Sequence, residues 1–94
     1  MSLHEIWRLI DADLARARDT LPQSAQTSDV VCQYEEYIDN NELELACDML
    51  ATYAEDHPVT KEFWLALRDA ATKMELPERA SHFEACSKSA EKHH

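Results

Sequence analysis

The chain contains no glycine, although average usage is about 7% of residues. Phosphate-binding loops, dinucleotide fingerprints, nucleophile elbows and type I′ hairpins all depend on glycine, because it adopts backbone conformations that strain other residues. The absence argues against these classes of site. It favours a helical protein whose function is binding rather than catalysis.

Cysteine and long apolar runs are also scarce. Cys32, Cys47 and Cys86 form an odd, widely spaced set without a C-x-x-C pair, so we expect reduced thiols rather than a disulfide framework. No apolar run approaches the roughly 20 residues that cross a bilayer, and no signal-peptide core is present. These features predict a cytoplasmic protein that does not bind membranes.

Basic residues are missing from the middle of the chain. No Lys or Arg lies between Arg18 and Lys61, and the formal net charge is −10. The interval holds ten of the nineteen acidic residues, while the other nine are balanced by all nine bases. Carboxylates repel phosphates, so nucleic acids and anionic lipids are unfavourable partners. We therefore expect a basic protein partner.

Apolar spacing predicts an all-α fold, a compact antiparallel bundle of four to five helices within a single domain, residues 1–94. Ser2 with Glu5 reads as a capping box for a helix over 3–19, and Pro22 to Thr27 reads as a polar connection. Thr27 or Ser28 is expected to cap a second helix, and Asn41 with Glu44 a third over about 42–56. Thr60 is expected to cap the fourth helix, Pro77 opens a fifth, and the tail is expected to fray from about residue 88.

The helix over 42–56 is apolar on most sides, which predicts a central position among the others. One of its stripes consists of Leu45, Met49 and Tyr53. The sequence leaves open whether this stripe is core or interface, and with it whether the protein is a monomer or a homodimer. Trp7, Phe63, Trp64 and Phe83 fall on predicted inward faces.

Catalytic and metal sites have weak support. His82 and Cys86 stand four residues apart on one helical face, with Glu78 a turn earlier, which makes two ligands and a doubtful third. His93 and His94 are interpreted as remnants of an expression tag. Glu91 alone is followed three residues later by a His, His94, and the di-iron bundle pattern needs such a motif on each of two helices, which excludes it. We expect no enzyme activity, no metal and no cofactor.

Three segments carry a family resemblance: YEEYIDNNELELA from Tyr34, then CDMLATYAED, then FWLALRDAATKMEL from Phe63. Within residues 30–76, about half the chain, the chain resembles the MafI-like family of small immunity proteins from bacterial polymorphic toxin systems. The shared features are Asn41-Glu42, the pair Leu45-Ala46, and Trp64 followed by residues 70–76.

Membership would imply a cytoplasmic antidote that binds and blocks a toxin domain, often a nuclease. Under this hypothesis the partner-binding surface is a set of carboxylates: Glu35, Glu36, Asp39, Glu42, Glu44 and Asp48. Tyr37 or Leu45 is a candidate apolar anchor. The alternative is a helical adaptor or secretion chaperone that holds a partner helix in an apolar groove on Leu45, Met49 and Tyr53.

Overall fold

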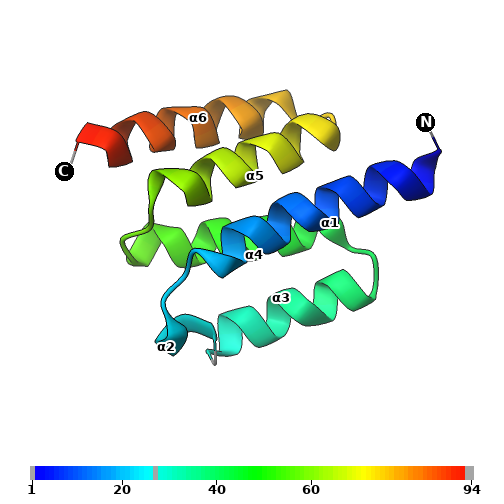
Figure 1. Ribbon diagram of the computed structural model, residues 1–94, viewed down its shortest axis with the longest axis horizontal. Helices are drawn as coiled ribbons and strands as arrows, with labels where there is room; N and C mark the ends of the chain where they lie inside the picture. Colours follow the sequence, from blue (N-terminus) through cyan, green and yellow to red (C-terminus); the bar gives the residue numbers. More distant parts are fainter. Residues whose placement is uncertain (1, 27, 93–94) are drawn as a thin grey trace.

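The computed structural model describes residues 2–26 and 28–92, and those residues form helices and turns without a strand. The helices are α1 (Leu3–Asp19), α2 (Gln23–Gln26), α3 (Asp29–Asp39), α4 (Leu43–Asp56), α5 (Lys61–Lys73) and α6 (Pro77–Lys92) (Figure 1). The all-helical prediction is confirmed. Five of the helices are long, and the sixth is the single turn α2.

The segment predicted as a polar connection contains that extra helix. Ala25 donates its backbone N–H to the carbonyl of Pro22 at 2.9 Å, and its side chain is buried. The side-chain amide of Gln26 donates to the carbonyls of Arg18 and Leu21, at 2.8 and 3.2 Å. These bonds satisfy carbonyls at and just beyond the end of α1 and fold the connection back against it.

Three of the predicted helix caps are confirmed. Ser2, Ser28 and Thr60 each accept a hydrogen bond from the backbone N–H three residues later, at 3.3, 3.4 and 3.2 Å. A hydroxyl at this position satisfies one of the four N–H groups that a helix leaves unpaired at its start. These caps set the beginnings of α1, α3 and α5.

The predicted cap at Asn41 is wrong. Asn41 has a φ of 58° and closes α3 instead of opening α4. Its N–H donates to the carbonyl of Ile38 at 3.0 Å, and the N–H of Glu42 donates to that of Tyr37 at 2.8 Å. This is the Schellman arrangement, in which asparagine replaces glycine because it tolerates the left-handed conformation. Glu42 then occupies the N-cap position of α4 without a side-chain cap.

A second turn of the same kind joins α5 to α6. Glu75 has a φ of 60°, its N–H donates to Thr72 at 3.1 Å, and the N–H of Leu76 donates to Ala71 at 2.9 Å. A glutamate pays a steric cost in this conformation that glycine avoids. The chain thus makes both tight helix–helix turns without glycine.

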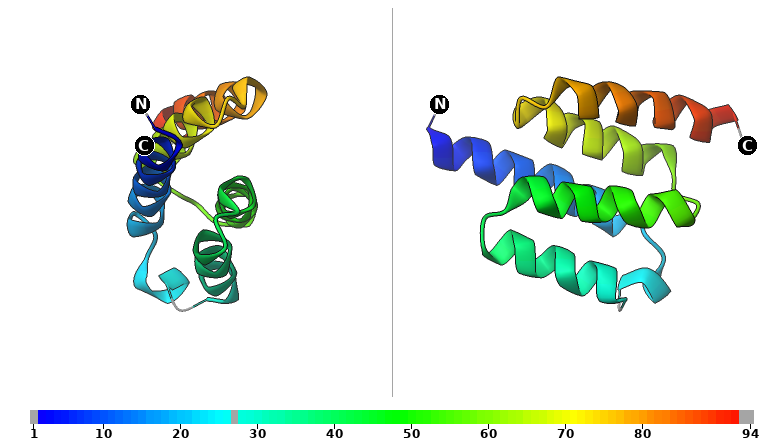
Figure 2. Two further views of the ribbon diagram at one scale, coloured as in Figure 1. Left: turned by 90° about the vertical axis from the view of Figure 1, so that its right-hand side faces the viewer. Right: turned by 180° about the vertical axis from the view of Figure 1, so that it is seen from behind.

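The helices form two layers. α1, α5 and α6 lie side by side in one layer, and α3 and α4 form the other, with α2 connecting them (Figure 2). Neighbours within a layer run antiparallel, as Figure 1 shows for α5 with α6 and for α3 with α4. The hydrophobic core lies between the layers.

α4 shares the central position predicted for it with α5. α4 contacts α3, α1 and α5, whereas α5 contacts α6, α1 and α4. Ala66, Ala70 and Ala71 on α5 are fully buried, and such small side chains let neighbouring helix backbones approach closely. α4 instead leaves Leu45 exposed on one side.

Three of the four predicted inward aromatics are core residues. Phe63, Trp64 and Phe83 are buried, and Trp64 stacks on Phe83 with ring centroids 6.0 Å apart. Trp7 is only half-buried. It therefore remains partly accessible at the edge of the two layers.

α6 continues beyond residue 88, where the sequence predicts fraying, as far as Lys92. Ala90 packs partly buried against the core, which gives the end of the helix a tertiary contact. His93 and His94 lie outside the described residues. None of the helices described has both the length and the apolar composition required to cross a bilayer.

Candidate docking surface

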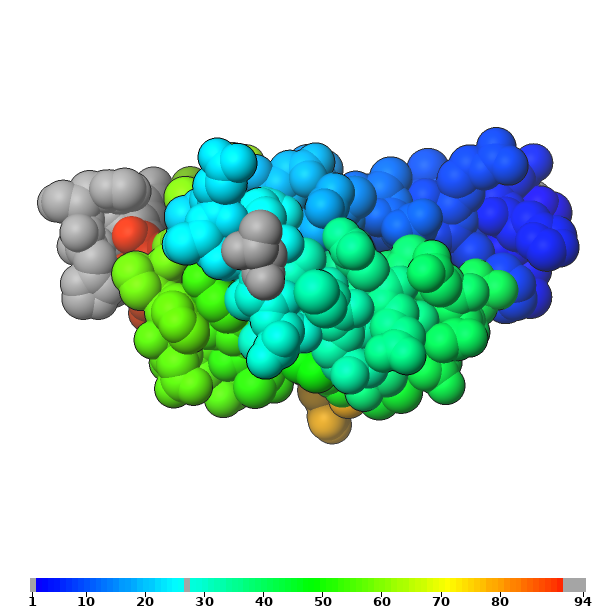
Figure 3. Space-filling view, turned by 90° about the horizontal axis from the view of Figure 1, so that it is seen from below, coloured from blue at the N-terminus to red at the C-terminus, as the bar shows by residue number. Residues whose placement is uncertain are grey.

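The base-free stretch of sequence folds as one side of the molecule. α3, α4 and the turn between them, residues 28–56, are called the acidic layer below, and Figure 3 shows these elements across one face. The layer has no Lys or Arg, because all nine bases of the chain lie on α1, α5 and α6. Its carboxylates are Asp29, Glu35, Glu36, Asp39, Glu42, Glu44, Asp48, Glu55 and Asp56.

An arginine of α6 forms ion pairs with two predicted site residues. Arg79 donates from Nε and one terminal nitrogen to the two carboxylate oxygens of Asp48, at 2.9 and 3.0 Å. Its other terminal nitrogen lies 2.9 Å from a carboxylate oxygen of Glu44. The bidentate geometry makes this the best-formed ion pair between the layers. Glu44 and Asp48 therefore help to join the two layers, in addition to any contact with a partner.

Glu35 is also paired, but more loosely. A terminal nitrogen of Arg18 on α1 lies 3.4 Å from its carboxylate oxygen. The Glu35 side chain is more than half exposed, so water screens the pair and its contribution to stability is small. Arg18 divides its charge between Glu35 and Asp19.

The other three predicted site residues remain available to a partner. Glu36, Asp39 and Glu42 are exposed and form no ion pair with any residue that the structure describes. Glu36 accepts one hydrogen bond, from the amide of Gln33 at 3.3 Å. The six predicted residues thus divide into a pair directed at α6 and a group on α3 and the following turn.

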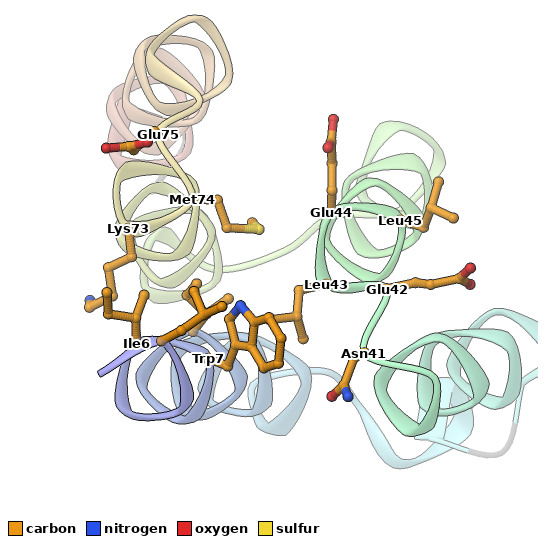
Figure 4. A pocket seen from close by; sticks show the side chains of 12 residues that line it. Ile6, Trp7, Asn41, Glu42, Leu43, Glu44, Leu45, Lys73, Met74 and Glu75 are labelled. Atoms are coloured by element: carbon orange, nitrogen blue, oxygen red, sulfur yellow. The ribbon is translucent and has the colours of Figure 1, made fainter. Parts of the chain in front are cut away.

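Leu45 is the exposed apolar residue of the acidic layer. Its exposed fraction is 45%, whereas Tyr37, the other candidate anchor, is half-buried. Figure 4 shows Leu45 and Glu42 pointing to the same side, away from α1. An apolar side chain beside free carboxylates is a suitable anchor for a basic partner.

The stripe on which the adaptor hypothesis depends is largely packed. Tyr53 is buried, and its ring stacks on His57 with centroids 4.1 Å apart. Met49 is half-buried against the core. Only Leu45 remains exposed, so the three side chains do not line a continuous groove.

Two buried ionisable groups remain neutral beneath this surface. Burial, more than the nearby carboxylates, raises the pKa of the Tyr34 phenol, although Arg18 opposes the shift. Burial also raises the pKa of the Cys47 thiol to about 12. Because a thiol attacks as its thiolate, Cys47 acts as a small apolar core residue.

Among the described residues, no third metal ligand joins the His82–Cys86 pair. The Cys86 sulfur lies 3.7 Å from Nε2 of His82, which confirms that they share a helical face. No group of three His, Cys, Asp or Glu side chains suited to a metal ion occurs within residues 2–26 and 28–92. Glu78 therefore does not complete the pair, and His93 and His94 are not among the described residues.

The arginines that organise this surface have no local sequence signal. Arg79 is 31 residues from Asp48, and Arg18 is 17 residues from Glu35. Only the docking of α6 and α1 against the acidic layer brings these charges together.

Comparison of the chain with protein-family models, with curated proteins and with solved structures found no match.

Proposed function

We propose that the protein is an inhibitor of the immunity type, which binds a basic toxin domain through the acidic layer. The observation that carries the proposal is the segregation of charge by layer. The acidic layer has nine carboxylates and no base, and its Glu36, Asp39 and Glu42 form no ion pair within the described part of the chain. An ordinary surface intersperses both signs.

The physical basis is electrostatic complementarity. A nuclease surface is basic because it must bind phosphates, so an acidic protein can occupy the same surface and exclude the nucleic acid. A field of one sign raises association rates by roughly 10- to 1,000-fold at low salt. Inhibition by occupation requires no catalytic residue and no cofactor, and we assign the carboxylates a docking role only. The inhibitor would act in the cytoplasm.

The experiment starts from the gene next to this one, since an antidote is inherited with its toxin. If the neighbouring reading frame encodes a basic domain, the two proteins are purified and their association rate is measured by surface plasmon resonance at low and high salt. The test variant is Glu36→Lys, Asp39→Lys, Glu42→Lys. These positions are chosen because reversal at Glu35 or Asp48 would also break ion pairs with Arg18 or Arg79.

The matched control reverses Glu5, Glu62 and Glu78, which are exposed residues of α1, α5 and α6 without ion pairs among the described residues. Both variants change the net charge equally. We expect the test variant to associate at least tenfold more slowly with a flatter salt dependence, and the control to change less. Equal effects in both would contradict a specific acidic docking face. Tight binding without salt dependence would favour an adaptor that holds its partner by apolar contacts.

A further inference from the structure

A groove opens where three distant segments meet at one end of the two layers. The groove has a volume of about 580 Å³ and is lined by the first half of α1, by the α3–α4 turn with the first residues of α4, and by the end of α5 with the turn after it. In Figure 4, the indole of Trp7 points toward Leu43, and Met74 points into the same gap from α5. This size lies within the roughly 300–1,000 Å³ typical of ligand sites.

The floor of the groove is apolar and partly open to water. Ile10 and Leu43 are buried and form its base, whereas Ile6, Trp7 and Met74 are half-buried. An indole and a thioether beside aliphatic side chains offer a surface that accepts aliphatic and aromatic groups of varied shape. Covering this floor removes apolar surface from water and thereby contributes to binding.

The rim of the groove is negative. Glu42, Glu44 and Glu75 line it, and Figure 4 shows the carboxylates of Glu42 and Glu75 directed outward at its two sides. Neither Glu42 nor Glu75 has an ion pair within the described part of the chain. Lys73 is the one basic residue among the described side chains at the rim. Its ammonium group already binds the carboxylate of the buried Asp13 at 2.5 Å, so it does not offset the acidic rim.

We infer that this groove anchors a basic amphipathic segment of the partner, holding its apolar side chains on the floor and its flanking Lys or Arg residues on the rim. The inference rests on the proposed function, since Glu42 and Glu44 belong both to the rim and to the acidic layer. A second copy of this chain is an unfavourable occupant, because it would bring an identical negative rim to the site.

The probe is a synthetic amphipathic helical peptide of Leu and Lys, with two counterparts in which Glu replaces Lys or Ser replaces Leu. Trp7 and Trp64 are the two tryptophans of the chain, and only Trp7 lines the groove. We expect the Leu/Lys peptide to shift the tryptophan emission to shorter wavelength. The shift should be lost in Trp7→Phe, where Trp64 remains buried. Neither counterpart should produce it.

Met74→Gln makes the floor polar without changing charge, and Met49→Gln is its matched control. Both methionines are half-buried, but Met49 does not line the groove. We expect Met74→Gln to weaken binding of the peptide roughly five- to tenfold, since interface energy concentrates in a few apolar anchors. Met49→Gln should change it less than twofold, with thermal unfolding checking that both variants fold.

The outcomes separate this inference from the proposed function. If the peptide bound in a salt-dependent way without a Trp7 signal or a Met74→Gln effect, the groove would not be its binding site. The acidic layer would then remain the proposed docking surface. If the Glu-containing peptide bound as tightly as the Leu/Lys peptide, the expected preference for a basic partner would be wrong for both the groove and the acidic layer. A dimer that Met74→Gln abolishes would make a second copy the occupant and overturn the inference. If the peptide did not bind up to its solubility limit, the inference would also be wrong. The acidic layer would still be tested by the association experiment with the natural partner.

Discussion

Arg79 on α6 donates two hydrogen bonds to the carboxylate of Asp48 on α4, at 2.9 and 3.0 Å, and forms an ion pair with Glu44 through its remaining terminal nitrogen. The pair connects two helices that belong to different layers. Each side chain is between a third and two fifths exposed, so solvent screening limits what the contact contributes. The arginine thus joins the layers, and its single positive charge offsets one of the two negative charges of Asp48 and Glu44.

Replacing Arg79 with Gln is expected to lower the free energy of unfolding by about 1 kcal/mol, because the bidentate pair is lost and two neighbouring carboxylates then repel each other. Urea unfolding measures the change. Lys88→Gln is the control, since Lys88 is exposed on the same helix and has no ion pair among the described residues. A double-mutant cycle with Asp48→Asn should assign most of the loss to the pair. Independent effects would show that the contact contributes nothing to stability.

The two left-handed turn residues should respond differently to glycine. Glu75→Gly is expected to stabilise the fold by about 1 kcal/mol, since glycine relieves the steric cost of positive φ. Asn41→Gly should change stability by only a few tenths of a kcal/mol, because asparagine already tolerates this conformation. Thermal unfolding checks both. Glu75→Ala separates backbone from charge: if alanine stabilises as much as glycine, the relieved cost was charge repulsion rather than strain.

Leu45 should contribute to partner binding although it contributes little to the fold. Leu45→Ala is expected to weaken binding of the basic partner roughly fivefold or more, because an exposed apolar group beside carboxylates is buried in the complex. Leu9→Ala is a close control, since Leu9 is a helical leucine with an exposed fraction of 43% on the opposite layer. Calorimetric titration measures both affinities. A matching loss for the two variants would remove Leu45 as an anchor.

The three thiols should react in order of exposure. Cys32 is exposed, Cys86 is half-buried with its pKa raised by burial, and Cys47 is buried with its pKa raised to about 12. Near pH 8 an aromatic disulfide reagent should modify Cys32 first and Cys86 more slowly, and Cys47 only on unfolding. Mass spectrometry of the modified peptides gives the order. Rapid modification of Cys47 in the native protein would mean that α4 opens readily.

Low pH should weaken the ion pairs of Asp69 on α5 with Arg16 on α1 and with the neighbouring Arg68. Burial acts to raise the pKa of the Asp69 carboxyl, but hydrogen bonds from Arg16 and Arg68 outweigh it and lower the pKa below its usual 3.8. A lowered pKa stabilises the fold above pH 4, and this stabilisation is lost as the pH falls through the folded-state value. Asp69→Asn should therefore cost about 0.5 to 1 kcal/mol at pH 7 and progressively less below pH 4.

Urea unfolding of wild type and variant at pH 7 and pH 3 measures that difference. Asp11→Asn serves as the control, because Asp11 is exposed and has no ion pair among the described residues. A cost for Asp69→Asn that is equal at both pH values would show that the hydrogen bonds do not depend on the carboxylate charge.

Local sequence rules predicted the helices well because the signals act within one helical turn. The hydroxyls of Ser2, Ser28 and Thr60 cap the helices that follow them, each by accepting from the backbone N–H three residues later. The same reasoning fails at Asn41, where a residue suited to opening a helix is equally suited to closing the preceding one. Asn41 closes α3 because the connection to α4 is short and the backbone N–H of Glu42 donates back to the carbonyl of Tyr37.

The sequence by itself determined that the chain is helical, where most helices begin and end, and that its middle carries acid without base. These properties depend on side-chain type and on neighbours within a few residues. Only the tertiary structure decided which carboxylates are paired and which are free, because Arg79 and Arg18 reach Asp48 and Glu35 across the layers. It also decided that Leu45 stays exposed and that Trp7, Leu43 and Met74 meet at one groove. Packing of helices distant in sequence creates such surfaces, and no local pattern encodes their geometry.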